Sequence, residues 1–296
     1  MVIGSFLPLF ERLRVLRLSN IRALGSGSAA VITGLHALAA AGPTSIETLV
    51  MDRTLRSGSF LDNQKFLDAC NSGERVQVRP KSTDAKNDDE NSLENRTSHN
   101  LIPTFCSFIR ASPSMSNFRA TEARMGDLGF SMVSSALFDS ANAVKSLHVG
   151  GNNLTPNSMS VLTTLLGTVS LKEYITGGAL ACGLVELSVS NNDIGNDGAC
   201  ILLPALTLYC PKLAVLEVDG NSLGKRAFQS ILDHTIPSLR SLNMGDNVDY
   251  DNIDPEEEGD KEKLAAMILE RYNDIQADGV EFELITDYDE DDLDFE

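Results

Sequence analysis

Residues 184–194 read Leu-Val-Glu-Leu-Ser-Val-Ser-Asn-Asn-Asp-Ile, and the same arrangement of residue types returns at 144–154 and 213–223. Each copy has an aliphatic residue at its first, fourth, sixth and eleventh positions and an asparagine at its ninth. The alternation around the fourth and sixth positions predicts a short β-strand with one buried face, because successive side chains of a strand point to opposite sides. One such unit cannot bury its own apolar face, so the recurrence predicts a stack of repeats.

The asparagine that follows each strand predicts a structural ladder. Its side-chain amide can both donate to and accept from backbone groups of the turn, and polar groups buried between repeats need such partners. The predicted ladder consists of Asn152, Asn192, Asn221 and Asn247. A small-residue segment such as 195–199 comes next, and apolar residues three and four apart, such as Leu202, Ala205 and Leu206, then predict a helix.

Weaker copies extend the repeat toward both ends of the chain. Met115–Met125 lacks the asparagine, Leu239–Asn247 starts a further copy, and Leu13–Leu18 and Ile46–Met51 predict two early strands. Val76 and Val78 predict a further short strand, and helices are expected at 29–41, near 60–70 and at 101–109. The predicted fold is therefore an α/β right-handed solenoid of about eight or nine repeats, with a parallel sheet on one face and helices on the other.

Segments that break the pattern predict insertions and a cap within one solenoid spanning 1–284. The polar stretch 79–100 has almost no apolar side chains and is predicted to be a disordered insertion. Residues 168–182 and 249–260 are predicted to be loop insertions. An amphipathic helix at 261–272 and the alternation of Val280, Phe282 and Leu284 predict a C-terminal cap over 261–284, followed by an acidic tail at 285–296. Whether the chain is a fragment of a longer repeat protein stays open.

The net charge of −18 is concentrated near the C-terminus. Asp249–Glu296 holds 20 acidic and 3 basic residues, which leaves 22 acidic and 21 basic residues in Met1–Val248. Such an acidic block repels phosphate, so nucleic acids and anionic membranes are not expected as partners.

Cysteine and histidine usage predicts neither a disulfide framework nor a metal site. The chain has five scattered cysteines, no Cys-x-x-Cys motif, and four histidines that lie far apart. No basic region precedes the apolar segment 1–10, and the Ala-rich run 29–41 is too short to span a bilayer. A reducing cytoplasmic location is therefore expected, with a nuclear or cytoskeletal one as alternatives.

The strand–asparagine–helix unit resembles the ribonuclease-inhibitor-like subfamily of leucine-rich repeats. The resemblance covers most of Leu13–Leu284 and is strongest over Leu184–Ala227. It implies a horseshoe with the parallel sheet on its concave face, and it implies a scaffold for protein binding. The subfamily includes the GTPase-activating protein of the small GTPase Ran, in which an acidic region also follows the repeats.

Two motifs invite a chemical interpretation, and each also has a simpler one. Gly25–Ala30 loosely matches a dinucleotide-binding loop, but no trailing acidic residue in a βαβ unit follows, so a repeat turn and no cofactor are expected. Glu217 and Asp219 lie on the same side of one strand and offer metal ligands, yet hard cations gather more oxygens than two carboxylates supply. A solvated acidic patch is the favoured interpretation, and no catalytic residue or metal ligand is predicted.

The solvent-facing strand positions are the predicted partner surface. Repeat spacing aligns these side chains, and the core does not need them. In chain order they are Arg17 and Ser19, Val50 and Asp52, Arg119 and Thr121, His148 and Gly150, Ser188 and Ser190, Glu217 and Asp219, and Asn243 and Gly245. Positive residues come early and negative ones late. The alternative is that these residues only keep the sheet soluble.

The expected function is a non-enzymatic scaffold that holds a protein partner on this face. One alternative is a GTPase-activating protein, in which Arg22 or Arg124 on a loop edge would stabilise the transition state. Another is a structural subunit of a larger assembly. The sequence does not name the partner.

Overall fold

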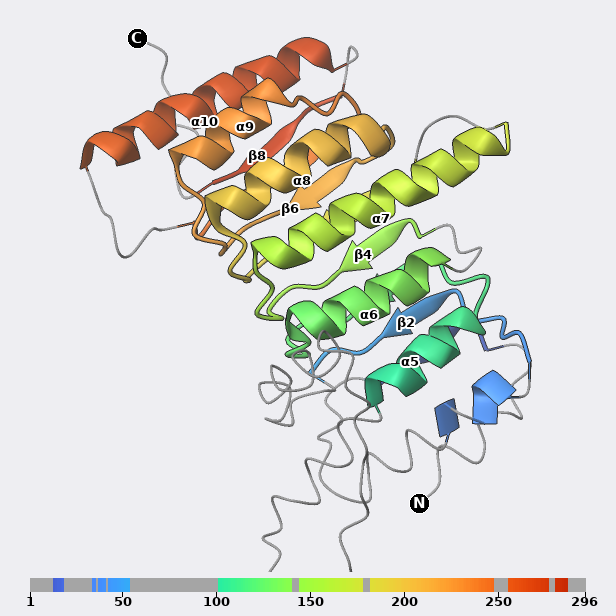
Figure 1. The fold of residues 1–296 in the computed structure, drawn as a ribbon. Helices are drawn as coiled ribbons and strands as arrows, with labels where there is room; N and C mark the ends of the chain where they lie inside the picture. The colour runs from blue at the N-terminus through green and yellow to red at the C-terminus, as the bar shows by residue number, and fades with distance from the viewer. Residues whose placement is uncertain are drawn as a thin grey trace, which may run out of the picture.

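The computed structural model describes residues 13–18, 34–35, 37–40, 42–53, 101–139, 144–177, 182–247, 255–276 and 280–286. Strands and helices alternate along these ranges (Figure 1). The strands are β1 (Val15–Arg17), β2 (Thr48–Val50), β3 (Asn117–Arg119), β4 (Ser146–His148), β5 (Glu186–Ser188), β6 (Val215–Glu217), β7 (Ser241–Asn243) and β8 (Glu283–Ile285). The helices are α5 (Leu101–Arg110), α6 (Gly126–Asp139), α7 (Pro156–Ile175), α8 (Gly195–Tyr209), α9 (Lys225–Asp233) and α10 (Pro255–Ile275).

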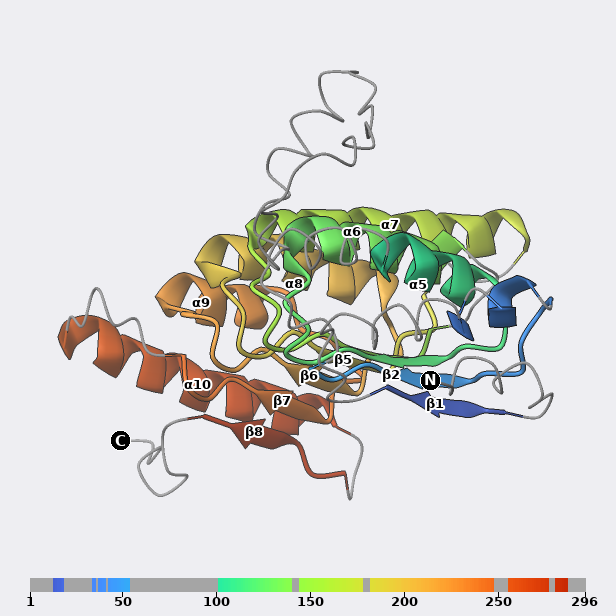
Figure 2. The same cartoon turned by 90° about the horizontal axis from the view of Figure 1, so that it is seen from below.

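The strands form one parallel sheet in chain order, from β1 to β8. Equivalent repeat positions pair, so that Leu147 lies beside Leu187 and Leu187 beside Leu216. Helices α5 to α9 lie in a second layer over one face of the sheet (Figure 2). The structure confirms the predicted α/β solenoid with a parallel sheet. The face of the sheet opposite the helices is called the concave face below.

The middle residue of each strand enters the core between the sheet and the helices. Leu49, Leu147, Leu187 and Leu242 are completely buried. Burial of one such side chain contributes roughly 1.5–3 kcal/mol, and a shift of one residue would turn it to the opposite face. The apolar spacing of the repeat therefore sets which side chains remain on the concave face.

Residues 168–175, predicted to belong to a loop, instead continue helix α7, and this part of the prediction is wrong. Leu171, Lys172 and Glu173 are strong helix formers, and no glycine lies between Gly167 and Gly177. Gly177 then adopts a positive φ of 89°, and its N–H donates to the carbonyl of Tyr174. The insertion thus lengthens a helix instead of forming a loop.

The strand predicted around Val76 and Val78 lies outside the described residues. Strand β2 pairs directly with β3, and Leu49 lies beside Phe118. The N–H of Met51 also donates to the carbonyl of Arg119 at 2.8 Å. Strands β2 and β3 are thus neighbours in the sheet although Leu49 and Phe118 are 69 residues apart in the chain.

Helix α10 and strand β8 lie at the C-terminal end of the described sheet, and the helix starts earlier than predicted. Helix α10 begins at Pro255, inside the predicted 249–260 loop, because proline is tolerated in the first turn, where its N–H is not needed. Strand β8 pairs with β7 and ends at Ile285, one residue beyond the predicted cap. The ring of Tyr272 stacks on Phe282 with centroids 4.4 Å apart.

Several predictions concern residues outside the described ranges. These are the helix near 60–70, the insertion 79–100, the Gly25–Ala30 motif, Ser19, Arg22 and the acidic tail from 287 to 296. The side chains of 101–104 and 255–259 also lie outside the described part.

Candidate functional site

Each strand places the residues on either side of its buried centre on the concave face. Of the predicted surface residues, Arg17 and Arg119 are exposed, and His148, Glu217 and Asn243 are partly exposed. Ser188 is only 4% exposed, because the neighbouring side chains cover it. Asp52 and Asp219 follow their strands on the same side and are partly exposed.

A second set of concave-face residues lies two positions before the first residue of each predicted pair, and it was not predicted from the sequence. It consists of Val15, Thr48, Asn117, Ser146, Glu186, Val215, Ser241 and Glu283. The signal was available, because these positions obey the same two-residue period as those named. Glu186 matters most, since its carboxylate lies 3.5 Å from Nε2 of His148 and accepts a 2.8 Å hydrogen bond from Ser146.

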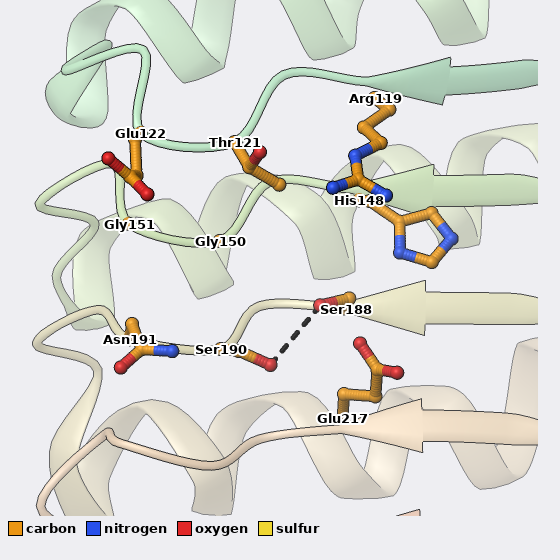
Figure 3. Close-up of a pocket in the computed structure, with 10 residues that line it drawn as sticks. All are labelled: Arg119, Thr121, Glu122, His148, Gly150, Gly151, Ser188, Ser190, Asn191 and Glu217. Carbon is orange, nitrogen blue, oxygen red and sulfur yellow. Dashed lines mark hydrogen bonds between the residues drawn. The ribbon is translucent and has the colours of Figure 1, made fainter. Parts of the chain in front are cut away.

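A cleft of about 510 Å³ opens on the concave face where β3 to β6 end (Figure 3). Its lining residues are Arg119, Thr121, Glu122, His148, Gly150, Gly151, Ser188, Ser190, Asn191 and Glu217. Arg119, His148 and Glu217 extend from three different strands toward the same space (Figure 3). The predicted residues Arg17, Asp52, Asp219 and Asn243 do not line this cleft.

Small residues make the cleft hollow. Gly150 and Gly151 follow β4, and Ser188 and Ser190 lie on and after β5. A Cβ on Gly150 would stand 3.1 Å from the backbone oxygen of Ser190, so the two neighbouring chains approach closely there. Larger side chains at these positions would fill the space between Arg119 and Glu217.

The positive charges on the N-terminal side of the concave face are paired locally. Nε of Arg119 lies 3.0 Å from Oδ2 of Asp52, and the two side chains come from neighbouring repeats. Arg53 and Glu122 form a second pair at 2.7 Å. Burial acts to raise the pKa of Asp52, but hydrogen bonds from Thr121 and the charge of Arg119 outweigh it and hold this pKa below its ordinary value.

The negative charges on the C-terminal side are arranged differently. Neither Glu217 nor Asp219 forms an ion pair with Lys or Arg in the part of the chain that the structure describes. Asp219 accepts a short hydrogen bond from the hydroxyl of Ser190. Partial burial raises the pKa of Asp219, and the nearby charges of Glu217 and Asp246 raise it further.

The asparagine ladder holds the turns behind this surface. Oδ1 of Asn152 accepts from the N–H groups of Ala123 and Met125, and its Nδ2 donates to three carbonyls, those of Ala120, Val149 and Gly150. Asn192 and Asn247 bond in the same way to the preceding repeat. Asn221 donates to three carbonyls, but its Oδ1 has no hydrogen-bond partner among the described residues. The ladder fixes the ends of the strands and hence the cleft.

Arg124, the described candidate for GTPase activation, is exposed in a turn with φ of 53°. Asn153 and Ser222 occupy the equivalent position of other repeats with φ values of 56° and 54°. Because the conformation recurs, it belongs to the repeat turn and does not distinguish Arg124.

Within the described residues, no group of three or more His, Cys, Asp or Glu gathers as metal ligands. None of the described helices combines the length and apolar composition that a membrane crossing requires.

Comparison with known families matches residues 183–199 to the leucine-rich-repeat model. The matched segment includes strand β5, Asn192 and the start of α8. A search of curated proteins finds no match for the chain.

Proposed function

We propose that this chain, a leucine-rich-repeat protein by its repeat match and its parallel sheet, is a non-enzymatic scaffold that holds a protein partner on the concave face. The observation that carries the proposal is the cleft over β3 to β6, into which the polar side chains Arg119, His148 and Glu217 extend from three strands. These side chains are held on a rigid sheet whose core does not use them. Preformed surfaces of this kind favour binding because little side-chain freedom is lost on association.

The scaffold role fits the residue types that the face presents. Arg119, His148 and Glu217 offer directional hydrogen bonds and charges that an exposed protein surface can match. Small hydroxyl side chains between them leave room for a protruding partner residue. No oriented nucleophile and base support a chemical reaction among the described concave residues.

Exchanging the two charges that flank the cleft tests the proposal. In the double variant Arg119→Glu with Glu217→Arg, the net charge is unchanged, while the positive and negative side chains on the two sides of the cleft are exchanged. We expect the immobilised variant to capture at least about tenfold less of the proteins that the wild-type chain retains from its native lysate, since one mispaired charge at an interface costs about 2 kcal/mol or more. Quantitative mass spectrometry of the eluates measures this ratio.

The matched control exchanges two exposed charges on α10, Lys263→Glu with Glu270→Lys. Capture by this control is expected to equal that of the wild-type chain. Equal capture by all three proteins, with circular dichroism showing each to be folded, would exclude the concave face as the partner surface.

A further inference from the structure

The charges of the concave face are distributed unevenly, because most of the described positive side chains form ion pairs and several of the described negative ones do not. On the N-terminal side, Arg119 is neutralised by Asp52 and Arg53 by Glu122. Arg14 lies 3.6 Å from Glu47. Arg17 remains on β1, five strands away from β6, which at about 4.8 Å per strand is roughly 24 Å. The positive end of the face is therefore mostly compensated from within.

The C-terminal side keeps its negative charge. From β4 to β8 the concave strand positions hold Glu186, Glu217 and Glu283, and Asp219 follows β6, but no Lys or Arg occupies these strand positions. Glu217 and Asp219 belong to the same strand and its extension, two residues apart, so both carboxylates face the same side. Glu217 lines the cleft directly, and Glu186 lies on the neighbouring strand beside His148.

The carboxylates are poorly compensated, and this favours one kind of occupant. Partial burial and the charges of Glu217 and Asp246 both disfavour ionised Asp219 and raise its pKa. A cation placed between Glu217 and Asp219 would relieve this repulsion. An anionic or purely apolar group would leave it in place and add the cost of removing water from the carboxylates.

Resting on the scaffold role proposed above, we propose that the concave face over β5 and β6 receives a basic side chain of the protein partner, with its cation between Glu217 and Asp219. The stem of this Lys or Arg would cross the cleft over the small side chains of Ser188 and Ser190. Its cation would reach Glu217, which lines the cleft, and Asp219, which lies beside it and accepts a hydrogen bond from Ser190. The two carboxylates suit the fork of an arginine, which can donate to two acceptors at once. The partner segment is therefore basic at the point of contact.

A random 12-residue peptide library displayed on phage supplies the probe, and it is selected on the immobilised full-length chain. Selection is repeated on Glu217→Gln with Asp219→Asn, a nearly isosteric variant that removes two charges. The control is Glu173→Gln with Glu270→Gln, which removes two exposed carboxylates from α7 and α10. All three proteins keep the acidic C-terminal segment, so non-specific attraction of basic peptides to it is the same in each.

Peptides with Lys or Arg at a shared position are expected to be enriched on the wild-type chain and on the control. We expect their enrichment to fall at least tenfold on the Glu217/Asp219 variant, and to fall on the wild-type chain when the salt concentration rises from about 0.05 M to about 0.5 M. Enrichment of basic peptides to the same extent on all three proteins would overturn the inference, as would enriched peptides that lack a shared basic residue. Binding that requires an added divalent cation would equally overturn it and assign the carboxylates to a metal.

The inference and the scaffold role fail in different ways. If lysate capture depends on the Arg119 and Glu217 exchange but is unchanged by Glu217→Gln with Asp219→Asn, the concave face binds a partner without a basic contact. If no capture depends on the concave face, the scaffold role itself fails.

Discussion

At the scale of single residues, the buried asparagines couple neighbouring repeats more directly than any apolar side chain. Asn152 is completely buried and makes hydrogen bonds to both its own turn and the preceding one. Replacing Asn152 by Ala leaves the N–H groups of Ala123 and Met125 and three carbonyls without this partner. We expect the free energy of unfolding to fall by about 3 kcal/mol, since each unsatisfied buried group costs about 1–3 kcal/mol. Urea denaturation followed by circular dichroism measures the loss.

Asn273→Ala provides the control for this change. Asn273 is exposed on α10, and alanine is the better helix former, so the free energy of unfolding should change by less than about 0.5 kcal/mol. Equal effects of the two substitutions would contradict the ladder's contribution to stability.

At the scale of elements, the starts of α7 and α9 are each held by a polar residue from the helix of the repeat before. Asp127, in the first turn of α6, accepts hydrogen bonds from the backbone N–H and hydroxyl of Thr155 at the start of α7, at 2.9 and 2.6 Å. Asn196 plays the same part for α9 by accepting from the N–H groups of Gly224 and Ala227. Helix packing therefore depends on caps that cross between repeats.

Acid should weaken this cap, and Asp127→Ala should remove it. Burial acts to raise the pKa of Asp127, but hydrogen bonds from Ser158 and Thr155 outweigh it and lower the pKa below 3.8. The carboxylate thus stabilises the fold above its ordinary pKa, and this contribution is lost as the pH falls through the lowered value. We expect Asp127→Ala to cost about 1–2 kcal/mol at pH 7 and much less near pH 2. Unfolding curves at several pH values measure both.

Asp197→Ala is the control, because Asp197 lies in the first turn of α8 as Asp127 lies in the first turn of α6. Asp197 forms an ion pair with Arg226 at 3.1 Å, and both side chains are about 70% exposed. An exposed pair contributes under about 1 kcal/mol, so this variant should stay close to the wild-type stability at every pH. A loss that is the same at pH 7 and pH 2 for Asp127→Ala would show that the cap acts without its charge.

At the scale of the whole molecule, stability is distributed along the solenoid because each repeat contacts its neighbours. The C-terminal end is closed by Phe282, which is 3% exposed and stacks on Tyr272. The hydroxyl of Tyr272 accepts from the N–H of Ile236 at 3.1 Å, and Gln276 donates to the carbonyl of Leu239 at 2.6 Å. The cap is thereby tied to the segment that leads into β7.

Phe282→Ala should open this end first. The lost burial costs about 3–5 kcal/mol, and amide hydrogen exchange should rise in α10, β7 and β8 while β3 and β4 keep their protection. Met267→Ala, which removes a 51% exposed side chain from α10, is the control and should leave exchange unchanged. A uniform rise along the chain would instead show that the solenoid unfolds as one cooperative unit.

The sequence by itself determined the repeat, the parallel sheet, the positions of the asparagines and the residues available to the concave face. These follow from short-range periodicity, because the spacing of Leu184, Leu187 and Val189 already decides which side of the strand is buried. Glu186 obeys the same two-residue period, so its place on the concave face also follows from the sequence.

Only the tertiary structure decided which charges of that face remain uncompensated. Asp52 and Arg119 are 67 residues apart, and they pair because β2 and β3 are neighbours in the sheet. The long intervening segment conceals in the sequence that β2 and β3 are neighbours in the sheet. A charge in the sequence is a local property, whereas its neutralisation depends on which repeats stack side by side. The gradient from positive to negative residues therefore became, in three dimensions, an end whose charges are largely paired and an end where Glu217 and Asp219 have no Lys or Arg partner among the described residues.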